Sequence, residues 1–285
     1  MSLPSQRLSA NQATASAMCK RYGSWAVVTG ASDGIGRAFA VELARQGFNL
    51  VLVARRTTLL ESLAGELMRT HGVVCRVFTA DLAETQAVSS LLAWTSDLDV
   101  GLLVAAAGFG TSGPFLSAPL DRECNMVAVN CTAVLMLSQG YGQRFAARGR
   151  GGLVLMSSLL GFHGTPFAAN YAATKAYVQS LAEGLRVEWA PLGVDVIASA
   201  PGPIRSGFAA RADLHMSASL APEVVARATL NALGHRTTVR PGWLSKLLGW
   251  SLAMLPRWGQ VMVITQVMKG MTAHQRTGKA GSGVT

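Results

Sequence analysis

The 285-residue sequence has few aromatic residues, few charged residues and only four cysteines, Cys19, Cys75, Cys124 and Cys131. No two cysteines form a Cys-x-x-Cys pair, and no histidine stands at metal-ligand spacing from any of them. A disulfide framework and a structural metal site are therefore both disfavoured. We predict that the chain holds no metal, and that its thiols are reduced and mostly buried, as in a cytoplasmic protein.

Long apolar runs are also missing. No stretch reaches the roughly 18 consecutive apolar residues that a membrane-spanning helix needs. Residues 1–22 contain no acidic residue and no apolar run, which argues against a secretory signal. Their Ser- and Ala-rich composition faintly resembles a transit peptide, but we expect a disordered tail.

The net charge of +10 is concentrated near the C-terminus. No Asp or Glu occurs from Val224 onward, whereas eight basic residues lie there: Arg227, Arg236, Arg240, Lys246, Arg257, Lys269, Arg276 and Lys279. Because the charge belongs to this region, the general fold need not explain it. No nucleic-acid recognition motif accompanies it, so we do not expect a nucleic-acid partner.

Short β-branched runs alternate with helix-length segments up to about residue 200. Their continuous rather than alternating hydrophobicity predicts strands that are buried on both faces, hence a parallel sheet between helices. We predict one α/β domain with a doubly wound parallel sheet, the Rossmann fold. The predicted strands are 25–29, 48–54, 73–79, 100–106, 152–157, 194–200 and a last edge strand at 237–239; the helices are 34–47, 57–71, 84–95, 121–148 and 169–190.

A glycine-rich stretch, TGASDGIG (29–36), joins the first strand to the first long helix. Gly30, Gly34 and Gly36 suit a tight turn and a close approach of the backbone to phosphates, and the helix N-terminus offers N–H groups to a pyrophosphate. We predict a dinucleotide site that also involves Ser32 and Ile35. Asp33 is expected to point to solvent or to cap the helix.

The end of the second strand indicates which dinucleotide binds. An acidic residue there would bind the ribose 2′-hydroxyl, but this chain has Ala54, Arg55 and Arg56. Two guanidinium groups suit bidentate contacts with a 2′-phosphate, so we predict NADP(H) rather than NAD.

Tyr171 stands four positions before Lys175, so the two side chains are neighbours on one helix face. Ser158 ends the fifth predicted strand, 13 residues earlier, and a Gly- and Pro-containing loop separates it from this helix. The three residues are therefore expected to meet at the carboxyl edge of the sheet.

These motifs, with Asp81-Leu82, Asn130 and Pro201-Gly202, follow in the order and spacing of the short-chain dehydrogenase/reductase family, which the sequence resembles over roughly residues 24–210. DGIGR, ARR and RPGWLSKLLGW (240–250) resemble the branch of 17β-hydroxysteroid dehydrogenases and very-long-chain 3-oxoacyl-CoA reductases. The resemblance implies a catalytic set of Asn130, Ser158, Tyr171 and Lys175. It also implies a cofactor site of Gly30, Ser32, Gly34, Ile35, Gly36, Arg55, Arg56, Asp81, Leu82, Ala107, Gly108, Tyr171, Lys175, Pro201, Gly202, Ile204 and Ser206.

Each implied role has a physical reason. Tyr171 would donate a proton, and Lys175, with oxidised nicotinamide, would lower its pKa from about 10. Ser158 would bind the substrate oxygen, and Asn130 would support a water linked to Lys175. Asp81 would contact adenine, although Asp81 to Glu84 also matches a helix capping box.

One motif departs from the family. Ala105 and Ala106 replace the usual Asn-Asn of Asn-Asn-Ala-Gly, which removes side chains that brace the strands. We expect altered local bonding there and intact catalysis.

The segment 243–270 is apolar nearly all round, is interrupted by Pro256 and carries basic residues. It either caps the substrate pocket, contacts another subunit or lies on a membrane surface. We divide the chain into a tail (1–22), a Rossmann domain (23–241) and a hydrophobic, basic extension (242–285). His163 is expected to be a plain loop residue, with a place at the substrate entrance as the alternative.

The predicted function is NADPH-dependent interconversion of a hydrophobic ketone and a secondary alcohol, of a sterol-like or fatty 3-oxoacyl type, in lipid metabolism. The alternative is a non-catalytic NADP-binding sensor or scaffold. We expect a cytoplasmic homodimer or homotetramer, assembled through the helices at 121–148 and 169–190, with possible peripheral contact to a membrane.

Overall fold

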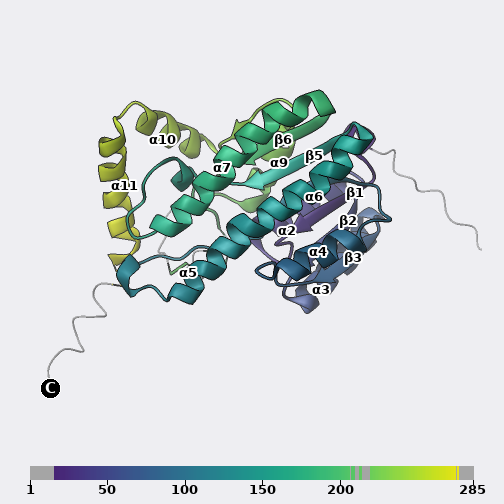
Figure 1. Cartoon of the computed structure of the whole chain (residues 1–285), viewed down its shortest axis with the longest axis horizontal. Helices are drawn as coiled ribbons and strands as arrows, with labels where there is room; N and C mark the ends of the chain where they lie inside the picture. The colour runs from purple at the N-terminus through teal and green to yellow at the C-terminus, as the bar shows by residue number, and fades with distance from the viewer. Residues whose placement is uncertain (1–15, 206, 209–211, 214–218, 274, 276–285) are drawn as a thin grey trace, which may run out of the picture.

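The computed structural model describes residues 16–205, 207–208, 212–213, 219–273 and 275. They build a seven-stranded sheet in the order β3-β2-β1-β4-β5-β6-β7, and every neighbouring pair is parallel (Figure 1). The predicted doubly wound sheet is confirmed, and each predicted strand coincides with an observed one to within two residues. The strands are β1 (Trp25–Thr29), β2 (Asn49–Ala54), β3 (Cys75–Thr79), β4 (Val100–Ala105), β5 (Gly151–Met156), β6 (Val194–Ser199) and β7 (Thr238–Val239).

Helices cover both faces of the sheet. One apolar core joins the sheet to α2 (Gly34–Arg45), α3 (Thr57–His71) and α9 (Pro222–Ala232). The other joins it to α4 (Thr85–Trp94), α6 (Ala133–Arg148) and α7 (Ala169–Trp189).

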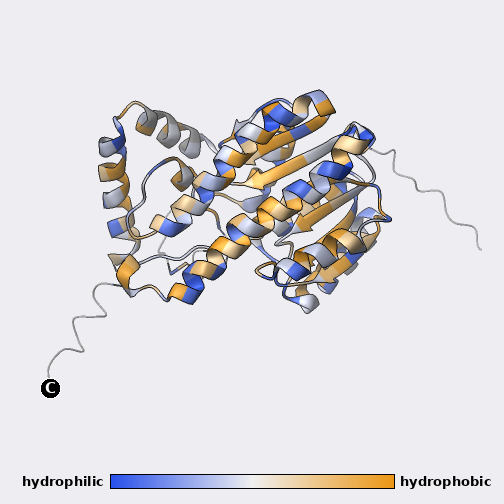
Figure 2. Cartoon of the chain, in the orientation of Figure 1, coloured by the Kyte–Doolittle hydropathy of each residue, from blue (hydrophilic) through white to orange (hydrophobic). Residues whose placement is uncertain are grey.

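The strands are hydrophobic on both faces because both faces are buried. In β1, Ala26 and Val28 belong to one core and Val27 to the other, and all three are fully buried. The central strands in Figure 2 accordingly have the colour of apolar residues. This arrangement explains the continuous apolar runs in the sequence.

The helix predicted at 121–148 is interrupted. It consists of α5 (Leu120–Val127), a π-helical turn η2 (Ala128–Thr132) and α6. Such a turn inserts an extra residue into the helix, and π-turns are frequent at functional sites.

Part of the expected N-terminal tail is folded. Residues 1–15 lie outside the described chain, but Ala17–Tyr22 form the short helix α1. The side chain of Tyr22 is only 2% exposed, and its hydroxyl donates a hydrogen bond of 2.8 Å to Asp195 Oδ2. Helix α1 therefore lies before the predicted domain boundary at residue 23 and packs against the domain.

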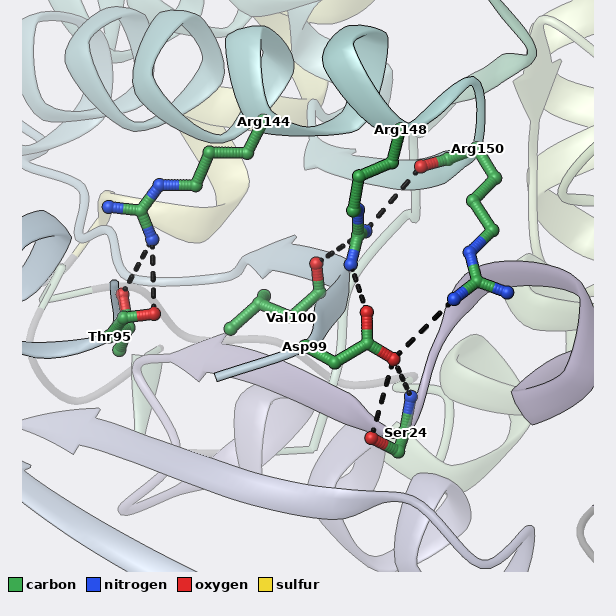
Figure 3. A network of polar contacts seen from close by, with 7 residues as sticks. All are labelled: Ser24, Thr95, Asp99, Val100, Arg144, Arg148 and Arg150. Atoms are coloured by element: carbon green, nitrogen blue, oxygen red, sulfur yellow. Dashed lines mark hydrogen bonds and ion pairs between the residues drawn. The ribbon is translucent and has the colours of Figure 1, made fainter. Parts of the chain in front are cut away.

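A cluster of arginines lies at the amino-terminal ends of β1 and β4 (Figure 3). The site described below lies at the opposite, carboxyl ends of the strands. Arg148 and Arg150 pair with Asp99, whose Oδ2 also accepts a 3.2 Å hydrogen bond from the Ser24 N–H. Arg144 donates to the Thr95 carbonyl at 3.2 Å. The cluster ties α6 to the starts of β1 and β4.

Two helices of the C-terminal segment, α10 (Trp243–Ala253) and α11 (Arg257–Met271), project beside the start of α7 (Figure 1). Leu252, Ile264 and Met268 form a third apolar cluster with Met126 and Tyr171. No helix among the described residues is both long enough and apolar enough to cross a bilayer.

Candidate active site

A cavity of about 820 Å³ lies at the carboxyl ends of the strands. The strand order reverses between β1 and β4, and in open α/β sheets ligands bind at that point. The volume falls within the roughly 300–1,000 Å³ of typical ligand sites. Of the predicted site residues that the structure describes, all except Asn130 line this cavity.

The glycine turn closes one end of the cavity. Gly30 and Gly34 have φ values of +68° and +55°, in the left-handed region that favours glycine. A Cβ added to Gly36 would lie 2.2 Å from the carbonyl oxygen of Gly30. Helix α2 begins at Gly34, so its first N–H groups face this tight backbone cradle. The residues of this cradle fit a phosphate group, and its binding stays a prediction.

Two guanidinium groups flank the glycine turn. Arg56 donates hydrogen bonds of 3.3 and 3.0 Å to Ser32 Oγ and lies 3.9 Å from Asp33. Arg55 pairs with Asp81 at 3.5 Å. Asp33 is the N-cap residue of α2, but its side chain makes no capping hydrogen bond.

The capping box expected at Asp81 to Glu84 is not formed. Helix α4 begins at Thr85, and its N-cap residue, Glu84, makes no side-chain capping bond. Asp81 Oδ1 instead accepts a 3.0 Å hydrogen bond from the N–H of Ala83, which holds its carboxylate at the cavity beside Leu82. The local turn competes with the helix cap for the same carboxylate.

The loop after β4 is braced from β1. The Ala107 N–H donates a 3.0 Å hydrogen bond to Thr29 Oγ1, so a threonine hydroxyl at the end of β1 holds the loop that follows β4. Gly108 lies against the catalytic end, because a Cβ there would stand 2.9 Å from Asn130 Oδ1 and 3.5 Å from Lys175 Nζ. The altered local bonding expected from Ala105 and Ala106 stays a prediction.

Asn130 lies in the π-helical turn and is fully buried. Its Nδ2 donates to the Phe109 carbonyl at 2.9 Å and to Thr174 Oγ1 at 3.0 Å, and its Oδ1 accepts from the Phe109 N–H at 3.2 Å. The side chain therefore joins the β4 loop to α7. It stands behind the cavity wall and is not a lining residue.

Ser158, Tyr171 and Lys175 converge at the middle of the cavity. Ser158 follows β5, and Tyr171 hydrogen-bonds to it. Lys175 Nζ donates a 2.9 Å hydrogen bond to the carbonyl of Met156 and lies 5.8 Å from the centre of the Tyr171 ring. All three side chains are buried, with at most 9% exposure.

Burial dominates the electrostatics of this trio. Loss of solvent raises the pKa of Tyr171 to about 12, and the hydrogen bond with Ser158 only partly offsets the rise. Burial lowers the pKa of Lys175 to about 8, while the nearby Cys131 opposes that shift. The charge of Lys175 is not among the causes of this shift, so the expected lowering of the Tyr171 pKa by Lys175 together with oxidised nicotinamide stays a prediction. The phenol is kept protonated.

Pro201, Gly202 and Ile204 follow β6 and line the cavity, whereas Ser206 lies outside the described residues. The Gly202 N–H donates a 3.2 Å hydrogen bond to Ser245 Oγ on α10. The C-terminal segment therefore contacts the loop after β6 that the resemblance assigns to the cofactor site.

The far end of the cavity is apolar and was not assigned residue by residue from the sequence. Phe208 lies 5.4 Å from the ring of Tyr171, centre to centre. Leu252 of α10 and Ile264 of α11 complete this part of the lining. The signal for it in the sequence is the apolar C-terminal segment, whose helices α10 and α11 contribute these lining residues.

His163 contacts this cap. Its Nδ1 lies 2.7 Å from Oε1 of Gln260 in α11. This contact joins α11 to the end of the 3₁₀ turn η3 (Leu159–Phe162). His163 is not part of the cavity lining. It lies in the loop that follows η3, as expected, and its ring is bound to α11 there.

Comparison with known proteins agrees with this geometry. A family model described as short chain dehydrogenase matches residues 24–216. A 7beta-hydroxysteroid dehydrogenase of Clostridium sardiniense is 33% identical over 231 residues, which cover 80% of this chain and 88% of that protein. A very-long-chain 3-oxoacyl-CoA reductase of Podospora anserina is 38% identical over 181 residues, 62% of this chain and 53% of that protein.

Two solved structures share most of this architecture. One, from a study of 7beta-hydroxysteroid dehydrogenase stereoselectivity, has a TM-score of 0.81 and 28% identity, and covers 86% of this chain and 98% of its own. The other is a short-chain dehydrogenase from Sphingobium yanoikuyae in complex with NADPH, with a TM-score of 0.72 and 30% identity, covering 76% and 86%. The chain belongs to the short-chain dehydrogenase/reductase family and is an oxidoreductase that acts on CH–OH and C=O groups.

Proposed function

We propose that the protein interconverts a hydrophobic ketone and a secondary alcohol with NADP(H). One observation carries the proposal: a single cavity has a phosphate cradle and two arginines at one end, Ser158, Tyr171 and Lys175 in the middle, and an apolar wall at the other end. A nucleotide and a lipophilic substrate can therefore meet at the three polar side chains.

In the reductive direction, bound NADPH would supply a hydride to the carbonyl carbon. Ser158 and Tyr171 hold the substrate oxygen through their hydroxyl groups. Tyr171 donates its phenolic proton to this oxygen as negative charge develops there. The ammonium of Lys175 then stabilises the phenolate, which solvent reprotonates. One ketone, one NADPH and one proton give one alcohol and one NADP⁺.

Arg55 and Arg56 support NADPH over NADH. Both line the nucleotide end of the cavity, and no acidic residue ends β2. Planar guanidinium groups bind phosphate through two parallel hydrogen bonds. The related short-chain dehydrogenase that binds NADPH supports the same assignment.

The substrate class is a sterol-like or fatty 3-oxoacyl compound. The substrate end of the lining is largely aliphatic and aromatic, with Phe109, Phe208, Leu252, Ile264 and Met268. The names of the related hydroxysteroid dehydrogenase and 3-oxoacyl-CoA reductase support these two classes. A place in lipid metabolism in the cytoplasm remains part of this proposal.

The outer face of the C-terminal extension supports a peripheral membrane contact. Trp243, Met254 and Trp258 are 75%, 72% and 70% exposed, next to a basic segment without acidic residues. Tryptophan and basic side chains are favoured at the lipid headgroup level. We retain the boundaries 23–241 for the Rossmann domain and 242–285 for the extension, and a homodimer or homotetramer built on α6 and α7.

A panel of ketones tests the proposed function. Turnover of hydrophobic ketones, followed as NADPH oxidation, is the expected result. Tight NADPH binding without turnover of any carbonyl compound would instead favour the alternative, a nucleotide sensor or scaffold.

A further inference from the structure

Four segments that are distant in the sequence meet beside the substrate end of the cavity. One follows β4, one precedes α7, one follows β6 and one follows α11; the residues that meet are Ser112 with Gly113, Phe167, Ala212 with Asp213, and Gln275. Each segment also supplies a lining residue of the cavity at or near this meeting point: Thr111, Ala168, Ala212 and Met271. The contacts between the four segments therefore bear on the shape of the substrate end.

The side chains of Ser112 and Gln275 form the centre of this meeting point, and we call the two residues the clasp. The Ser112 hydroxyl donates to the Ala212 carbonyl at 2.6 Å, and the Asp213 carbonyl lies 3.2 Å from the same oxygen. Gln275 Nε2 donates to Ser112 Oγ at 2.9 Å and to the Asp213 carbonyl at 2.7 Å. A side-chain amide has two protons to donate and a hydroxyl has one, so both groups are fully used as donors in these contacts.

The backbone at the meeting point is strained. Phe167 and Asp213 have φ values of +63° and +52°, and they are the non-glycine residues of the described chain with positive φ. This conformation is unfavourable for a residue with a Cβ and persists where surrounding contacts hold it. The Phe167 carbonyl accepts a 2.8 Å hydrogen bond from the Gly113 N–H, and the Asp213 carbonyl is bound by Gln275. Such strain is concentrated at active sites and ligand clamps.

Ala212 connects the clasp to the catalytic tyrosine. It is 2% exposed and lines the cavity, and its N–H donates a 2.8 Å hydrogen bond to the Phe208 carbonyl. The Phe208 ring lies 5.4 Å from the Tyr171 ring, and a Cβ added to Gly110 would stand 2.7 Å from Phe208 Cζ. Phe208 and Ala212 pack in one apolar cluster with Tyr171. A displacement of Ala212 would therefore move the Phe208 ring and change the space beside Tyr171.

We propose that Ser112 and Gln275 are positioning residues that hold the Phe208 ring beside Tyr171, and that they thereby select substrates by the bulk of the group next to the carbonyl. This inference rests on the proposed function and assigns part of its selectivity to residues outside the catalytic trio. With the clasp intact, the ring is a fixed wall that keeps a compact ketone within reach of Tyr171. Without the clasp a compact ketone is held less firmly, whereas a bulky substituent fills the space itself.

The kinetic test uses acetophenone and benzophenone, which have a methyl and a second phenyl group, respectively, at the carbonyl carbon. Gln275→Glu keeps the shape of the side chain, but a carboxylate only accepts, so both hydrogen bonds from Nε2 are lost. Loss of a neutral hydrogen bond changes an equilibrium by about twofold to tenfold. The ratio of kcat/KM for acetophenone to that for benzophenone should fall by this factor in Gln275→Glu, and it should also fall in Ser112→Ala.

Two measurements separate positioning from a general loss of structure. The Kd for NADPH should stay within about twofold of wild type, because the clasp lies outside the nucleotide end of the cavity. The control variant is Gln266→Glu, the same substitution on the exposed face of α11 and outside the cavity lining, which should keep the wild-type ratio. An unchanged ratio in Gln275→Glu, or an equal loss for both ketones, would overturn the proposal.

Amide hydrogen exchange separates this inference from the proposed function. Exchange of the Ala212 N–H, which is bonded to Phe208, is followed by NMR in the NADP⁺-loaded protein and requires no turnover. Faster exchange at Ala212 in Gln275→Glu, with Gln266→Glu unchanged, supports the clasp even in a protein that reduces neither ketone. Equal exchange at Ala212 in wild type and Gln275→Glu refutes it, even in an active enzyme.

Discussion

Replacing Arg55 by alanine tests how the chain selects its nucleotide. A charge-assisted hydrogen bond to a phosphate contributes about 1.5–3 kcal/mol. To make it, Arg55 must leave Asp81, with which it forms a 3.5 Å ion pair whose two side chains are 66% and 41% exposed. An exposed pair of this kind contributes only about 0–1 kcal/mol, so a net of about 1–2 kcal/mol remains for the 2′-phosphate.

Loss of this net binding free energy corresponds to a rise of about fivefold to thirtyfold in the Kd and KM for NADPH. NADH has no 2′-phosphate, so its constants should stay within about twofold of wild type. The assay is fluorescence titration with each nucleotide, followed by steady-state kinetics on one ketone. The matched control is Arg69→Ala, which removes an arginine from α3, the helix that follows Arg55 and Arg56, but outside the cavity lining. Equal losses for NADPH and NADH would refute the reasoning, because they would show a general defect of the site.

Three further predictions follow from other parts of the structure. In Gly36→Ala the new Cβ would lie 2.2 Å from the carbonyl oxygen of Gly30, so this variant should lose about 1–3 kcal/mol of unfolding free energy and should no longer bind NADPH. The control is Gly184→Ala in α7, where the new Cβ meets no atom within 4 Å. Thermal and chemical unfolding should show this control to be neutral or stabilised. Between pH 8 and 10.5 the unfolded chain binds more protons at Lys175 than the native chain does, so the free energy of unfolding rises with pH in this range. Lys175→Met should lose that rise, and its free energy of unfolding at pH 7 should exceed that of the wild type by at most about 3 kcal/mol. An unchanged pH profile of urea unfolding in this variant would contradict the low pKa of Lys175. Trp258→Ser should weaken flotation with anionic vesicles, as deletion of 243–285 should, and equal flotation of all three proteins would exclude the membrane contact.

Much of the fold follows from local patterns. Strands such as β1 are buried on both faces, so their apolar runs are visible in the sequence, and Gly30, Gly34 and Gly36 mark a turn that only glycine allows. The residues with chemical roles follow strand ends, and parallel strands bring those ends to one edge. Topology alone therefore predicts that Ser158 and Tyr171 meet.

What could not be predicted depends on contacts between distant segments. The π-helical turn at Asn130 has the same apolar period as the helices around it, so no local signal marks it. The packing of α1 depends on Tyr22 meeting Asp195, 173 residues away. The raised pKa of Tyr171 follows from its burial, in a cluster that includes Phe208 and residues of α11, and such burial is a property of the folded chain.

The proton-donor role of Tyr171 is the central claim. Tyr171→Phe removes one hydroxyl from a buried ring and leaves the nucleotide end of the cavity untouched. General acid catalysis contributes about 10²–10⁴ in rate, so kcat for ketone reduction should fall by that factor while the Kd for NADPH stays within about twofold. Tyr177→Phe, on the exposed face of the same helix, should keep full activity. Ketone reduction by Tyr171→Phe at the wild-type rate would contradict the account.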